Sequence, residues 1–141
     1  MSTVSVVLAH GAWADGSTWA RVIGPLVESG HEVSAAALPL SSFDADVAAV
    51  ERSLERVSGP TVLVAHAYAG AVIAATSNPQ VKALVYVTAL APDQGETVAE
   101  VFYRAAAHPR APQLAPDSHG LIYLPQAAFA TAFAPTAPGS S

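Results

Sequence analysis

A short stretch near the middle of the chain has the pattern of a tight turn built to carry a nucleophile, with no nucleophile in it. Residues 61–70 read Thr-Val-Leu-Val-Ala-His-Ala-Tyr-Ala-Gly, an apolar run followed by small residues. Where a strand turns sharply into a helix, only small residues fit on either side of the apex, because the two backbones pass close together. Ala65, Ala69 and Gly70 meet that demand, and Ala67 stands where such an elbow carries Ser. The pattern predicts the geometry of a nucleophile elbow with its hydroxyl missing, and it places Ala67 at the apex with φ above zero, in a left-handed conformation.

The loop after the first apolar run is the second stretch that could do chemistry. Residues 8–13 read Leu-Ala-His-Gly-Ala-Trp, and in a parallel sheet this loop lies at the same edge as the elbow, beyond the carboxyl ends of the strands. A backbone N–H from such a loop and the N–H after the nucleophile position form an oxyanion hole. We expect the amides of Ala12 and Tyr68 to be these donors. The side chains and backbone expected to contact substrate are those of Gly11, Trp13 and His66.

Other side chains could take over the missing chemistry, although each has a simpler interpretation. His66 precedes the apex and should point to the opposite side of the strand from Ala67, packed under the turn. His10 is expected to order its own loop, and His108 lies in Pro-rich sequence. Asp93 is a candidate alternative acid, but Pro-Asp-Gln-Gly is also a typical turn sequence. No spacing resembles a metal site, and no glycine pattern supports nucleotide binding, so no cofactor is expected.

Composition excludes several other classes of function. About half of the residues are hydrophobic (52%), only 12% are charged, and the formal net charge is −5. The six basic residues are scattered, so there is no basic surface for nucleic acid or anionic lipid. Without cysteine there is neither a disulfide framework nor a thiolate nucleophile. No secretion signal or membrane-spanning run is evident, and a cytoplasmic protein is expected.

Strand and helix patterns alternate, which predicts an α/β fold with a parallel sheet of about four strands flanked by helices. The expected strands are 4–9, 32–38, 61–64 and 81–90, in the spatial order 32–38, 4–9, 61–64, 81–90 with right-handed crossovers. The expected helices are one around Trp19 that ends at Gly30, one within 41–57, and one over 71–76. Pro25 inside the first of these helices indicates a kink or a late start.

The character of the sequence changes after residue 94. We expect residues 1–94 to form the core and residues 95–134 a helical cap segment with helices over 96–107 and 125–134. A Pro-rich connector over 108–117 joins them. Residues 135–141 consist of Pro, Ala, Gly, Thr and Ser and are expected to be a disordered tail.

Taken together, these stretches resemble the α/β-hydrolase superfamily, with small bacterial esterases and relatives of the hydroxynitrile lyases as the nearest likeness. The resemblance covers residues 3 to about 134 and rests on 10–13, Trp19, 30–33, 38–39, 65–70 and 85–93. It implies that the four strands are the central ones of the family sheet. It also implies that the family's acid and catalytic His lie on two later strands that this chain does not supply.

The resemblance implies the amino-terminal part of a serine hydrolase for carboxylic esters or related acyl substrates, inactive because Ala67 replaces Ser and the acid and His are absent. One alternative is a natural non-catalytic relative that acts as a binding or interaction protein. Another is a lyase on the same fold, although that chemistry also uses the Ser and His. A small ester or carbonyl compound is the expected ligand.

The strand over 81–90 also predicts association. In the family sheet two further strands lie on its outer side, so its edge should expose unpaired N–H and C=O groups and apolar side chains. We expect self-association or completion of the sheet by a carboxyl-terminal fragment.

Overall fold

A computed structural model of the chain describes residues 3–105, 109, 111–112 and 114–128. It divides into two compact units, Met1–Phe102 and Tyr103–Ser141. Four strands and the helices around them lie in the first unit.

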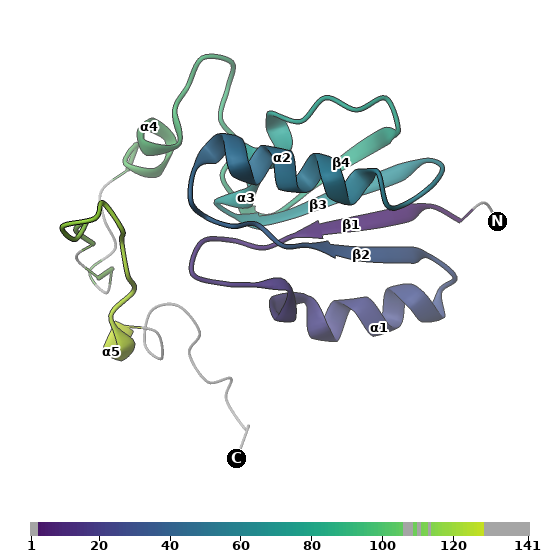
Figure 1. Cartoon of the computed structure of the whole chain (residues 1–141), viewed down its shortest axis with the longest axis horizontal. Helices are drawn as coiled ribbons and strands as arrows, with labels where there is room; N and C mark the ends of the chain where they lie inside the picture. The colour runs from purple at the N-terminus through teal and green to yellow at the C-terminus, as the bar shows by residue number, and fades with distance from the viewer. Residues whose placement is uncertain (1–2, 106–108, 110, 113, 129–141) are drawn as a thin grey trace. The chain divides into compact units, whose positions relative to one another are not determined.

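The sheet of the first unit has four parallel strands in the order β2-β1-β3-β4 (Figure 1). These strands are β1 (Ser5–Ala9), β2 (Glu32–Ala36), β3 (Thr61–Ala67) and β4 (Val81–Ala89). Ala9 pairs with Ala36 on one side and with Ala65 on the other, so β1 and β2 end at one level and β3 runs two residues farther, to Ala67. The predicted parallel order is confirmed, and β2 ends two residues earlier than expected.

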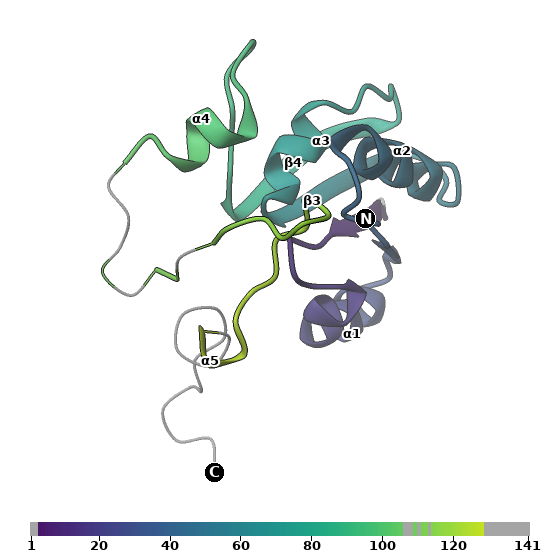
Figure 2. The ribbon, with the colours of Figure 1, turned by 60° about the vertical axis from the view of Figure 1, so that its left-hand side comes forward.

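Helices cover the two faces of this sheet unequally. The helix α1 (Ala20–Glu28) lies on one face, and α2 (Phe43–Leu54) and α3 (Ala69–Ala74) lie on the other (Figures 1 and 2). Side chains alternate along each strand, so β1 contributes to a core on each face. Val7 and Ala9 belong to the larger cluster with α2 and α3, whereas Val6 and Leu8 pack with Trp19.

Local sequence explains where these helices begin. The carboxylate of Asp15 accepts the N–H of Ser17 and starts a 3₁₀ turn, η1 (Gly16–Trp19), which runs into α1. Pro25 is the sixth residue of α1, so the helix does not start late at the proline but begins at Ala20, directly after that turn. The hydroxyl of Ser42 accepts the N–H of Ala45 and caps α2.

The helix expected over 96–107 is shorter at both ends in the described residues, where α4 spans Val98–Phe102. Its start is fixed by a reciprocal capping box: Thr97 N–H donates to the Glu100 carboxylate, and Glu100 N–H donates to the Thr97 hydroxyl. Residues 106–107 lie outside the described part.

In the second unit, the carboxylate of Asp117 accepts the N–H groups of His119 and Leu121 and forms a turn. The short helix α5 (Gln126–Ala128) falls within the helix expected over 125–134. The rest of that helix, His108 and the tail expected over 135–141 lie outside the described residues. No helix in the described ranges is long and apolar enough to cross a membrane.

Candidate functional site

The turn between β3 and α3 has the geometry of a nucleophile elbow. Ala67 is the last residue of β3 and has φ of +53°, a left-handed conformation, and α3 begins two residues later. That conformation costs an L-residue about 1–2 kcal/mol, so neighbouring structure must hold it. The Ala67 carbonyl accepts the N–H of Leu90, and Thr88 of β4 forms a bulge opposite the apex. The left-handed apex predicted from the sequence is confirmed.

Small residues around the apex allow α3 to approach β4. A Cβ on Gly70 would overlap the carbonyl oxygen of Leu90 and lie 2.9 Å from the Cβ of Ala89. Ala65 and Ala69, on either side of the apex, are fully buried. Glycine at position 70 is therefore a packing requirement, which is the physical basis of the small-residue pattern.

The loop after β1 reaches the elbow. A Cβ on Gly11 would lie 3.0 Å from the Cβ of Ala67 and 3.3 Å from the carbonyl oxygen of His66, so the two backbones are in close approach. Ala12 is half-buried, and Trp13 is 38% exposed with φ of +59°. The structure thus brings together the loop and the elbow from which the expected oxyanion donors and substrate contacts come.

His10 is a structural clamp in this loop. Its ring is buried, its Nε2 accepts the N–H of Leu38 at 3.0 Å, and its Nδ1 lies 2.9 Å from the carbonyl oxygen of Gly11. Because Nε2 is an acceptor, the hydrogen sits on Nδ1 and donates to that carbonyl. Both ring nitrogens are used, so His10 ties the ends of β1 and β2 together and is not available as a base.

His66 lies on the α1 side of the sheet, opposite to α2 and α3. Its ring meets Trp19 edge to face, with centroids 6.4 Å apart and planes at 84°. Its Nδ1 is buried and makes no hydrogen bond to any residue in the described part of the chain. The side chain is therefore packed under the turn, and a role of His66 in binding substrate stays a prediction.

A buried carboxylate that the sequence interpretation missed supports the elbow from the other face. Asp46 of α2 is 1% exposed, and its two oxygens accept the Tyr68 hydroxyl at 2.7 Å and the Leu40 N–H at 2.8 Å. Burial, and then the bond to Asp46, raises the pKa of the Tyr68 hydroxyl far above its ordinary value. The signal in the sequence was helical spacing, which places Asp46 in line with the apolar Val50 and Leu54.

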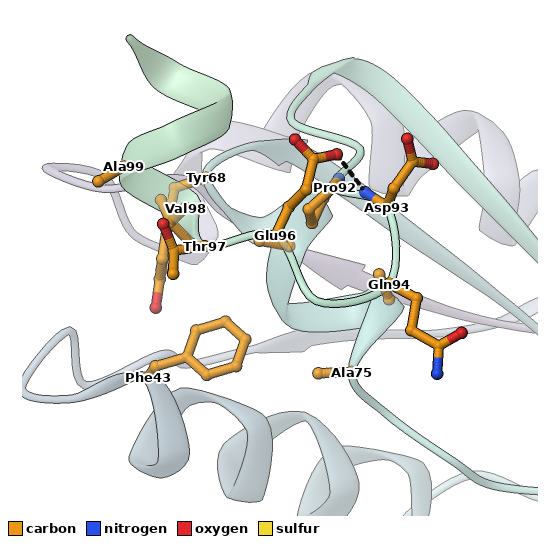
Figure 3. A pocket seen from close by; sticks show the side chains of 12 residues that line it. Phe43, Tyr68, Ala75, Pro92, Asp93, Gln94, Glu96, Thr97, Val98 and Ala99 are labelled. Carbon is orange, nitrogen blue, oxygen red and sulfur yellow. Dashed lines mark hydrogen bonds between the residues drawn. The ribbon is translucent and has the colours of Figure 1, made fainter. Parts of the chain in front are cut away.

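A cavity of about 900 Å³ lies beside Tyr68 in the first unit, between the start of α2, the helix α3 and residues 92–99. Figure 3 shows the ring of Phe43 in its wall and the carboxylate of Asp93 directed away from that ring. Asp93 is exposed, and its N–H donates to the Glu96 carboxylate at 2.8 Å while its carbonyl accepts the Glu96 N–H. Asp93 thus sits in a turn, and its role as an acid stays a prediction.

In the described part of the chain, no three His, Cys, Asp or Glu side chains are grouped so that they could hold a metal ion.

A known protein family and several solved structures are similar to this chain. A model of the family described as "Alpha/beta hydrolase family" matches residues 6–140. A pyrethroid hydrolase from Sphingobium faniae JZ-2 is similar in structure, with 27% identity, a TM-score of 0.71, and coverage of 84% of this chain and 54% of that one. No curated protein sequence matches significantly.

Two further structures share the fold at lower identity. An extracellular alpha/beta-hydrolase from a Paenibacillus species has 23% identity and a TM-score of 0.61, covering 69% of this chain and 45% of that one. A mutant of polyneuridine aldehyde esterase has 19% identity and a TM-score of 0.65, covering 73% and 47%. The chain thus spans about half the length of the structures it resembles.

Proposed function

The chain belongs to the alpha/beta hydrolase family, and we propose that it is the amino-terminal part of a serine-hydrolase-type member that acts on carboxylic esters or related acyl compounds. We further propose that the 141 residues by themselves do not hydrolyse such substrates. The observation that carries both statements is Ala67, held at φ of +53° in the frame of small residues that an elbow requires. The likeness to a named hydrolase at 27% identity supports the reaction class.

In this proposal the elbow and the loop after β1 form the site. Ala67 marks the vacated nucleophile position, and the amides of Ala12 and Tyr68 are the oxyanion donors. Gly11 and Trp13 contact the acyl compound from the loop. Two convergent N–H donors can polarise a carbonyl, but acyl transfer also needs a nucleophile and a base. The expected behaviour is binding of a small ester or carbonyl compound without turnover.

The second candidate is a natural non-catalytic binding protein on the same fold. The observation that favours it is the tight packing of Gly11 on Ala67, which leaves the elbow fully built around a methyl group. Both candidates predict an inactive chain, and they differ in whether restoring the missing groups restores the reaction. A cytoplasmic location is part of both proposals.

Four successive residues of β4 support the proposal that another polypeptide completes the sheet. Leu84, Val85, Tyr86 and Val87 are 42%, 41%, 39% and 41% exposed. Successive strand residues point to opposite faces, so in the described residues neither face of β4 is well covered. We propose that a second copy or a carboxyl-terminal fragment pairs with this edge. Light scattering after size exclusion tests this: association that Val85→Lys abolishes supports it, and a stable monomer contradicts it.

The reaction is tested by restoring its missing parts. We compare Ala67→Ser alone, a chimera that joins this chain to the unmatched carboxyl-terminal part of the Sphingobium hydrolase, and the same chimera with Ala67→Ser. Only the chimera with Ser should release nitrophenol from p-nitrophenyl acetate. Because all three are compared after a check of folding by circular dichroism, a folded but inactive Ser chimera would favour the non-catalytic alternative. Activity of Ala67→Ser alone would contradict the proposed need for the missing strands.

A further inference from the structure

Among the residues that the structure describes, two buried polar atoms on the α1 side of the sheet make no hydrogen bond to the protein: Nε1 of Trp19 and Nδ1 of His66. Trp19 is 5% exposed, so its N–H is shielded from bulk water. A buried polar group left unpaired destabilises the folded state. Native proteins satisfy nearly all such groups, with ordered water where no protein atom is in reach. Two such atoms on neighbouring rings therefore point to a small molecule that pairs with both.

The two atoms are chemically complementary. The indole nitrogen can only donate a hydrogen bond, whereas Nδ1 of a neutral imidazole accepts one when the hydrogen sits on Nε2. Two hydrogen bonds of about 2.9 Å each through a single oxygen join nitrogens up to about 5.5 Å apart. Rings whose centroids lie 6.4 Å apart, nearly perpendicular, are compatible with such a bridge.

Gly11 lies close to the same nitrogen of His66. A Cβ on Gly11 would lie 3.6 Å from Nδ1 of His66, and any residue other than glycine would occupy that space. The surroundings are otherwise apolar, since Trp19 belongs to the cluster formed with Val6 and Leu8. A buried pair of one donor and one acceptor suits a small neutral molecule and disfavours an anion, which the lone pair of Nδ1 would repel.

We propose that one ordered water molecule binds between Trp19, His66 and Gly11, accepting a hydrogen bond from Nε1–H and donating one to Nδ1. This water holds the His66 ring as the Nε2–H tautomer. It also links the start of α1 to the strand that carries the elbow, on the side of the sheet opposite to the Asp46–Tyr68 bond.

The site is tested on the unmodified chain by nuclear magnetic resonance with nitrogen-15 labelling. The expected result is a rotating-frame Overhauser contact between water and the indole hydrogen of Trp19, slow solvent exchange of that hydrogen, and ring shifts of His66 for the Nε2–H tautomer. The same indole hydrogen in the urea-unfolded chain serves as the control for fast exchange. In Trp19→Phe, the His66 ring should lose its single tautomer while the chain remains folded.

Three results would overturn the proposal. A scalar coupling between the two nitrogens would show a direct Trp19–His66 hydrogen bond. Absence of any water contact at a slowly exchanging indole would show a dry site. An Nδ1–H tautomer in the unmodified chain would place a donor where an acceptor is required. All three are read from the unmodified chain, so they stand even if Trp19→Phe does not fold.

Discussion

The Tyr68 hydroxyl donates a hydrogen bond of 2.7 Å to the buried carboxylate of Asp46, across the interface between α2 and α3. The same carboxylate accepts the N–H of Leu40, a residue with φ of +58°. One side chain thus fixes both the loop after β2 and the residue that follows the elbow apex. The stability of the elbow depends on this bond.

Tyr68→Phe should lower the free energy of unfolding by about 1–3 kcal/mol, because it leaves a buried carboxylate oxygen without its donor. Urea denaturation followed by circular dichroism measures the change. Tyr123→Phe is the matched control, since Tyr123 is 69% exposed and should change stability little. Equal stability of the two variants would show that the Asp46–Tyr68 bond contributes nothing.

The raised pKa of Tyr68 predicts a loss of stability in alkaline solution. A tyrosine whose pKa is higher in the folded state ionises first in the unfolded state, near pH 10. The stabilisation is therefore complete below about pH 10 and is lost as the pH rises towards the folded pKa. Denaturation midpoints measured between pH 8 and 11 should decrease once the pH exceeds about 10. In Tyr68→Phe this decrease of the midpoint with pH should be less steep. If the midpoint of the variant decreases as steeply as that of the unmodified chain, groups other than Tyr68 cause the loss of stability.

Gly70→Ala should destabilise the chain by about 3 kcal/mol or more, because the added methyl group overlaps the Leu90 carbonyl. Gly24→Ala is the control: a Cβ there meets no atom within 4 Å. Its effect should stay within about 1 kcal/mol, since better helix propensity is offset by the following proline. Thermal unfolding compares the two variants, and a tolerated Gly70→Ala would contradict the close approach of α3 to β4.

Ala67→Gly should stabilise the chain by about 1 kcal/mol, because glycine adopts the left-handed apex without strain. Ala65→Gly, two residues earlier in an extended and fully buried position, should instead destabilise it by a similar amount. Chemical denaturation of both variants gives the signs directly. Destabilisation by Ala67→Gly would argue against a strained apex.

The parallel strand order and the left-handed apex could be predicted from sequence because both follow from local patterns. β-branched runs mark the buried strands, and Ala65, Ala69 and Gly70 record a steric demand of the backbone. Trp19 shares a helical register with the apolar Ile23 and Leu26, and it is 5% exposed.

Other features depend on contacts between distant segments and could not be predicted. The bond between Asp46 and Tyr68 joins residues 22 positions apart, and the Nε2 of His10 accepts from a residue 28 positions away. The residue at which a helix begins also depends on side-chain contacts. The capping box of Thr97 and Glu100 makes α4 begin at Val98, two residues later than expected. Such pairings become visible only once the fold places the partners together.

The proposed elbow carries a methyl group where a nucleophile would stand, and hydrolysis of p-nitrophenyl acetate by the unmodified chain is the sharpest test of that proposal. Nitrophenol release should be no faster than that from the heat-denatured chain, because a methyl group at Ala67 cannot attack an ester. Saturable release that heat denaturation abolishes would overturn the proposal and assign the reaction to another group, with Asp93 the first to be replaced.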